Sequence, residues 1–269
     1  MLTLMRDCKL VSIFWNGRPR PTLTGIETIA TFLAMKWSVF VVCMSVVAGL
    51  PASQIISRPA SSIKKRDAID LFTNYNSSSF AKLPEARTQI DLEHINQDLL
   101  DAAVFHETNR RRQERGLPAL AYHDKARTMA QIQARAMAKG RFVEHTNPER
   151  DKGTLADRAK FVGLRPRFAA ENVASTFGRR YKSGQPFYTR EEGGRKIYSY
   201  EPNGKPIPIH TYLSFAEDLV DSWMQSPGHR ENILHKTPQY LGCACELSRD
   251  ATAMETFYCA QVFLKPTSN

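Results

Sequence analysis

Apolar residues recur with helical spacing in several parts of the chain. In residues 91–115 they fall three or four positions apart, and Gly116 and Pro118 follow. This pattern predicts a helix that begins at Asp91, whose side chain can cap the free N–H groups of the first turn. The same reasoning predicts three further helices, over residues 123–139, 154–163 and 212–225.

Strand-like sequence dominates the second half. Residues 185–200, QPFYTREEGGRKIYSY, place the turn sequence EEGG between two aromatic-bearing runs and predict a hairpin. YLGCACEL at 240–247 and TFYCAQVF at 256–263 predict two more strands. Helices come first and strands later, without the alternation that builds parallel sheets. The predicted fold class is therefore α+β with an antiparallel sheet.

The N-terminal region, residues 1–52, is interpreted as a signal peptide region. Lys36 precedes an apolar run from Trp37 to Gly49, and small residues surround Ala52. The signal-peptide pattern is clearest when it is read from Met35, so Met35 is a possible true start of the protein. A membrane span needs about 20 apolar residues, so cleavage is favoured over an uncleaved anchor at about 28–50, the one way in which this chain would meet a membrane.

These boundaries give a domain organisation and a location. Ser-rich residues 53–90 are predicted to be a linker or arm, followed by a domain over 91–267 with a hairpin insertion at about 178–211. Export predicts a secreted, periplasmic or cell-envelope protein.

Composition narrows the class of protein. The 269 residues are 42% hydrophobic and 24% charged, which excludes a collagen-like or wholly disordered chain. The formal net charge is +10, but basic and acidic residues alternate along most of the sequence. That pattern is typical of a solvated surface, so no nucleic-acid partner is predicted.

Three cysteines follow the signal region. A turn centred near residue 251 would place Cys243 opposite Cys259, so these two are the disulfide candidates, with Cys245 free. The alternative is three reduced, buried thiols. Their spacing lacks the C-x₂-C pairs of zinc sites.

The candidate chemistry rests on histidine and glutamate. No HExxH helix, GxSxG elbow or phosphate-binding glycine loop is present. His145, Glu171, His229 and Glu231 instead lie beside predicted helix ends. Two imidazoles with a carboxylate can bind a divalent cation, although a histidine at a helix end often only caps carbonyls. His106 and His123 are interpreted as solvated, and His210 as a residue that could approach the site.

Several motifs occur together in a specific order. NRRRQERGLPALAYHDKA is followed by His145, by the EN pair Glu171–Asn172, by WMQSPGHRENIL, and by YCAQVF. Over residues 95–264 the chain resembles the CAP superfamily of cysteine-rich secretory proteins, antigen 5 and pathogenesis-related 1, in its bacterial SCP-like form. The resemblance implies an α-β-α sandwich around a small antiparallel sheet.

The resemblance also implies a site. Two histidines and two glutamates line a central cleft in this family, and the histidines can hold zinc or a similar divalent ion. By motif, His145 and His229 are the metal ligands and Glu171 is the first glutamate. The fourth position falls on Ser226, and the nearby acidic residues Glu217, Asp221 and Glu231 are not in the family's place.

Other residues have supporting roles in this interpretation. Asn172 is expected to fix a loop after Glu171, and Trp223 to form core or cleft wall, with Ser226 and Glu231 beside them. The insertion could dock a glycan, lipid head group or protein through its aromatic and basic residues, or simply cover a sheet edge. Those residues are Arg179, Arg180, Tyr181, Phe187, Tyr188, Tyr198 and Tyr200.

Three functions are consistent with these sequence features. The first is an exported binding module for a small ligand, lipid, glycan or cell-surface protein. The second is a metal-dependent, protease-like hydrolase with His145, Glu171 and His229 as its catalytic candidates and Glu171 as base. The third is a structural envelope protein. The missing fourth carboxylate favours binding over catalysis, and no organic cofactor is expected.

Overall fold

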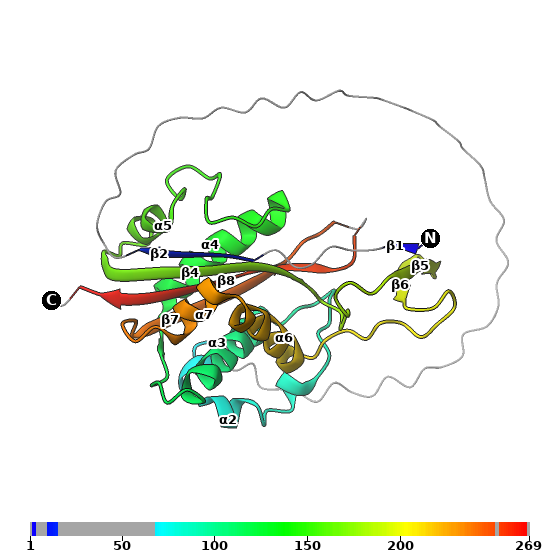
Figure 1. Cartoon of the computed structure of the whole chain (residues 1–269), viewed down its shortest axis with the longest axis horizontal. Coiled ribbons are helices and arrows are strands. Elements are labelled where there is room, and N and C mark those ends of the chain that lie inside the picture. The colour runs from blue at the N-terminus through cyan, green and yellow to red at the C-terminus, as the bar shows by residue number, and fades with distance from the viewer. Residues whose placement is uncertain (1, 4–9, 16–67, 251–252, 268–269) are drawn as a thin grey trace. The chain divides into compact units, whose positions relative to one another are not determined.

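A five-stranded sheet forms the centre of the protein, with helices on both faces (Figure 1). The computed structural model describes residues 2–3, 10–15, 68–250 and 253–267. The strand order is β2-β4-β8-β7-β3, in which β3 is parallel to β7 and all other neighbours are antiparallel. This is the α+β sandwich that the sequence predicts.

The helices are α1 (Asp70–Thr73), α2 (Ser77–Phe80), a 3-10 turn (Glu85–Arg87), α3 (Gln97–Gln113), α4 (Asp124–Gly140), α5 (Leu155–Phe161), α6 (Tyr212–Gln225) and α7 (Pro227–Leu234). Helices α3 to α6 correspond to the four predicted helices, whereas α1, α2 and α7 were not predicted. The strands are β1 (Leu2–Thr3), β2 (Leu10–Trp15), β3 (Ala121–Tyr122), β4 (Pro166–Phe177), β5 (Phe187–Glu192), β6 (Arg195–Ser199), β7 (Tyr240–Leu247) and β8 (Thr256–Pro266).

Helix starts follow local capping chemistry. Thr154 caps α5 as predicted, through a reciprocal capping box with Asp157. The predicted start of α3 at Asp91 is wrong, because Asn96 is the residue whose side chain accepts from the N–H of Leu99. The carboxylate of Asp91 instead accepts from the N–H groups of Glu93 and His94 in the preceding turn.

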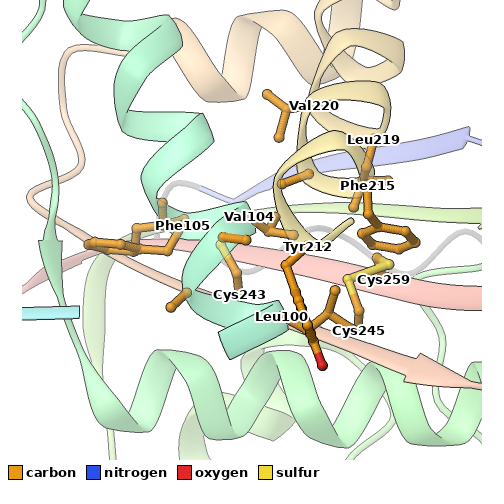
Figure 2. Packing of buried hydrophobic residues seen from close by; sticks show 14 of the residues in the cluster. Leu100, Val104, Phe105, Tyr212, Phe215, Leu219, Val220, Cys243, Cys245 and Cys259 are labelled. Carbon is orange, nitrogen blue, oxygen red and sulfur yellow. A yellow bond between two sulfur atoms is a disulfide. The ribbon is translucent and has the colours of Figure 1, made fainter. Parts of the chain in front are cut away.

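Two core clusters lie on opposite faces of the sheet. On one face α3 and α6 pack over β7 and β8, where Leu100, Phe215 and Cys245 meet (Figure 2). On the other face α4 and α5 contribute Met129, Ala130 and other small side chains. Alternate residues of a strand point to opposite faces, so β4 supplies side chains to both clusters.

Residues 70–90 belong to the folded domain, which corrects their interpretation as part of a linker. Phe72, Phe80, Ala86 and Ile90 are buried in the same cluster as α3 and α6. Short elements with few apolar residues carry little periodicity, so the sequence pattern missed them. The earlier part of the predicted linker, residues 53–67, lies outside the described residues.

The disulfide joins Cys245 to Cys259, and Cys243 is a buried free thiol. The predicted Cys243–Cys259 pair is therefore wrong. In the β7–β8 register Cys245 lies opposite Cys259, and Cys243 opposite Gln261. Moving the turn centre by one residue moves the partner of Cys259 by two positions, which keeps the same face of the sheet. Burial raises the pKa of the Cys243 thiol.

The predicted hairpin forms as β5 and β6, with Gly193 and Gly194 at positive φ in its turn. Its aromatic residues mostly pack inward: Phe187 and Tyr198 are buried with Ile207 and Met254. Arg179 is held by two contacts to the carboxylate of Glu255. Phe187, Tyr198 and Arg179 are thus held within the fold. Arg180 is exposed and Tyr188 is half-buried, so docking through the insertion stays a prediction.

Strand β2 is an element that the sequence pattern did not predict. It pairs with β4, and β1 pairs with β5 in a second, three-stranded sheet. The remainder of the predicted signal region, including Met35 and its apolar run, lies outside the described residues. Among the residues that are described, no helix is long and apolar enough to cross a bilayer.

Candidate functional site

Glu171 lies at the centre of the candidate site, fully buried in the middle of β4. Its Oε1 is 2.8 Å from Nδ1 of His145, where the ring N–H donates to the carboxylate. Its Oε2 accepts from Arg158 at 2.6 Å. Both oxygens are thus occupied by donors, and the negative charge is balanced by a guanidinium that is itself buried.

His145 is positioned by the loop between α4 and α5. The amide of Gln133, on α4, donates to the carbonyl of Glu144 at 2.6 Å. The buried Asn147 donates to Gln133 and to the carbonyl of Ile132. These contacts fix the backbone on both sides of His145. The imidazole ring is thereby held where its Nδ1 contacts Glu171.

Arg158 is a site residue that the sequence reasoning missed. It lies on α5 and also donates to the carbonyl of His145 at 3.1 Å. One feature of the sequence could have identified Arg158. It lies between Leu155 and Ala159 on the face of α5 that is buried. An arginine on an otherwise apolar helix face predicts a buried ion pair, because an unpaired buried charge is very costly.

His229 lies in the first turn of α7. Its Nδ1 is 2.7 Å from Oγ of Ser226, the residue that precedes the helix. Ser226 is the position where the resemblance implied a fourth acidic residue, and here its hydroxyl holds the second histidine. His229 is 2% exposed, and the contact with Ser226 helps to orient its ring.

Two asparagines tie α7 to β4 next to Glu171. Asn172 donates to the carbonyl of His229 at 3.2 Å, and Asn232 donates to the carbonyl of Glu171 at 3.3 Å. Asn232 also donates to Asn172 at 2.8 Å. Asn172 was expected to fix a loop, but it lies inside a strand and joins the strand to a helix. The network continues to Gln261 on β8.

The other predicted residues lie apart from this network. Trp223 is completely buried in the core cluster of α3 and α6, as the core interpretation expects. Glu231 is exposed, and no contact of the described residues joins it to His145 or Glu171. Asp221 pairs with Arg111 on α3, and Glu217 is exposed near Arg110 and Arg111.

Three further histidines lie outside the candidate site. His210 is buried, contacts Ser214, and faces Asp218. Neither of these contacts joins His210 to Glu171. Burial and then the charge of Arg180 lower the pKa of His210 to about 4. His106 was interpreted as solvated, and this is wrong: it is 3% exposed and stacks on Phe80. His123 is the N-cap of α4.

The surroundings of His145 are compatible with ligation of a metal ion through its second ring nitrogen. Nε2 of His145 is buried and makes no hydrogen bond among the described residues. An imidazole held through one nitrogen by a carboxylate, with the other nitrogen available, is the usual state of a metal-ligating histidine. Within the described ranges no group of three or more His, Cys, Asp or Glu side chains is placed to hold a metal.

The chain matches the family model of the cysteine-rich secretory protein family, CAP, over residues 105–263. This match covers more than half of the sequence and includes His145, Glu171 and His229. The chain therefore belongs to the CAP family. No protein in the curated set matches it.

Several solved structures are similar to parts of this chain at low sequence identity. An extracellular SCP-domain protein of Bacillus anthracis is 21% identical, with a TM-score of 0.42, and the match covers 63% of this chain and 41% of that one. A cysteine-rich secretory protein of Staphylococcus aureus is 16% identical, with a TM-score of 0.37 and coverages of 63% and 39%. The chain thus spans about two fifths of these two proteins.

A third structure has a length closer to that of this chain. The CAP domain of Enterococcal PrgA is 16% identical, with a TM-score of 0.40 and coverages of 77% and 84%.

Proposed function

We propose that this chain is an exported binding module of the CAP family in which His145 and His229 hold a divalent cation, zinc or a similar ion. The observation that carries the proposal is the state of His145. Its Nδ1 is fixed by Glu171, and its Nε2 is buried without a hydrogen-bond partner in the described part of the chain.

The second histidine fits the same chemistry. Its Nδ1 contacts Ser226, so ligation by His229 would use Nε2. When bound, a cation held by two imidazoles has open positions for a ligand's oxygen or nitrogen atoms. The chain's own residues hold the imidazoles in place: Glu171 fixes the first ring, and Ser226 the second.

Binding is favoured over hydrolysis by the environment of Glu171. A general base needs a carboxylate oxygen that can accept a proton from water. Both oxygens of Glu171 already accept hydrogen bonds, one of them from a buried arginine. Glu171 is therefore assigned the role of orienting His145, and it is poorly suited to be the base of the hydrolase alternative.

Zinc titration of the full chain by calorimetry tests the proposal. We expect one saturable site in the wild-type protein and its loss in both His145→Ala and His229→Ala. The exposed His94 provides a matched control, and His94→Ala is expected to bind as the wild type does. Unchanged zinc binding in both site variants, or none in a folded wild type, contradicts the metal site.

A second readout separates binding from catalysis. The zinc-loaded chain is incubated with a library of peptides and esters, and products are followed by mass spectrometry. We expect no turnover. Turnover that disappears in His229→Ala would replace the binding module with the hydrolase.

A further inference from the structure

The outer edge of β4 is covered by a segment from the distant N-terminus. β2 pairs antiparallel with β4 over six residues, from Leu10 opposite Ala174 to Trp15 opposite Ala169. Figure 1 shows β2 lying along β4 on the side away from β8. Upstream, β1 pairs with β5 at Phe187 and Tyr188. Two short strands of the N-terminal region thus pair with the edges of two different sheets.

The outer edge of β4 carries backbone groups that need a hydrogen-bonding partner. The other side of β4 is paired continuously with β8 from Phe168 to Phe177, so its hydrogen-bonding groups there are satisfied. On the outer side, β2 is the neighbouring strand of the described sheet. Without it, residues 169–174 would present a row of unpaired N–H and C=O groups, which is a template for strand addition.

The outer edge of β4 lies close to the candidate site. Residue 13 of β2 lies opposite Glu171, and residue 12 opposite Asn172. α7, which carries His229, packs against both β2 and β4, and α5, which carries Arg158, packs against β4. A strand added here therefore runs past the candidate metal site, although its backbone pairing needs no metal.

The sequence of the resident segment defines the chemistry of the occupant. LVSIFW is apolar, with β-branched and aromatic residues that favour an extended strand. It also lies within the N-terminal region that the sequence predicts to be removed on export, and its removal would expose the edge.

We propose that the outer edge of β4 is a peptide-binding site that takes an extended apolar segment of about six residues, antiparallel to β4 and opposite Ala169–Ala174. Residues 10–15 occupy this site in cis and compete with a peptide of the same chemistry in trans. The inference goes beyond the proposed metal site and does not depend on it.

The test uses the full chain and the synthetic peptide KKLVSIFWKK. A variant with Ser12→Pro and Ile13→Pro removes backbone donors from both alternating sets of β2 and prevents its pairing. The single variant Ile13→Pro provides a second, milder route to the same measurement.

We expect the double variant to bind the peptide at least about tenfold more tightly than the wild type, because cis occupancy reduces the competent fraction. Hydrogen exchange at residues 169–174 should be faster in the variant and slow again when peptide is added. Equal affinity for the two proteins, or unchanged exchange at these residues, overturns the proposal.

N-methylated peptides distinguish strand pairing from general adhesion. In an antiparallel pair only alternate residues direct their N–H groups toward the neighbour. N-methylation of the positions matching Val11, Ile13 and Trp15, or of those matching Leu10, Ser12 and Phe14, should abolish binding in one case and preserve it in the other. Equal loss with both peptides overturns the proposal. Peptide binding that survives in His145→Ala separates this site from the metal site.

Discussion

At the scale of single residues, the central feature is the pairing of Glu171 with Arg158 inside the protein. Both side chains are fully buried, and their charged groups are 2.6 Å apart. Such a pair contributes little net stability, because desolvation of the two charges offsets their attraction. The ion pair instead serves to position groups in the site: it holds the carboxylate of Glu171 next to Nδ1 of His145.

Removal of Arg158 should be strongly destabilising. Arg158→Ala leaves the carboxylate of Glu171 buried without its cation, and we expect a loss of about 3–5 kcal/mol in the free energy of unfolding. Urea denaturation at neutral pH measures this change. Lys160 is exposed on the same helix, so Lys160→Ala is the control and should change stability by less than about 0.5 kcal/mol. A loss below about 1 kcal/mol in Arg158→Ala would contradict the buried-pair interpretation.

At the scale of elements, the close approach of α4 to β7 shapes one face of the sheet. Gly242 lies where a side chain would enter the backbone of α4: a Cβ there would be 2.6 Å from Cα of Arg127. The guanidinium of Arg127 in turn holds the buried carboxylate of Asp101, on α3, through bonds of 3.0 and 2.8 Å. The absence of a side chain at one strand position therefore sets the spacing between three elements.

Substitution of this glycine should separate α4 from the sheet. Gly242→Ala is expected to lower the free energy of unfolding by about 3 kcal/mol, because the obstacle is rigid backbone and no flexible side chain can give way. Thermal and urea denaturation measure it. Gly153→Ala is the matched control, since a Cβ there makes its nearest contact at 3.5 Å. Similar stability of the two variants would show that α4 lies further from β7 than the structure has it.

At the scale of the whole molecule, residues 70–90 complete the helical layer around α3. Phe80 stacks on His106, with ring centroids 4.4 Å apart, and the ring nitrogen of His106 contacts the carbonyl of Leu71 at 2.7 Å. Ser77 donates to the carbonyl of His106 at 2.8 Å. The segment thus encloses an imidazole on α3, and burial lowers the pKa of His106 to about 4.

This enclosure predicts a dependence of stability on pH. The pKa of His106 is lower in the folded state than its ordinary value of 6.5, so the unfolded chain binds the extra proton between these values. Its contribution to stability is full above about pH 6.5 and is lost as the pH falls toward 4. The loss corresponds to about 3 kcal/mol.

A variant comparison isolates this effect. The difference in unfolding free energy between wild type and His106→Gln should shrink by that amount from pH 7 to pH 4, measured by urea denaturation. His210 is also buried, but it is present in both proteins and cancels. His94→Gln, at an exposed position, should leave the pH profile unchanged. A pH-independent difference between wild type and His106→Gln would show that the imidazole is not enclosed.

The sequence by itself determined the local structure and the identity of much of the site. The helical period located α4 and α6 to within a residue or so of their ends, and EEGG located the hairpin turn. His145, Glu171 and His229 of the candidate site were predicted from their motifs, and the match to the CAP family model spans all three positions. These features depend on neighbours close in sequence, or on strings of residues that can be read directly.

Tertiary structure decided how distant segments meet. The partner of Cys259 depends on a turn position that no local pattern fixes to one residue. The role of Arg158 depends on the packing of α5 against β4, and the burial of His106 on a segment some thirty residues upstream. The covering of the β4 edge joins residues far apart in the chain. In each case the free energy comes from contacts across the fold, which residue spacing alone does not specify.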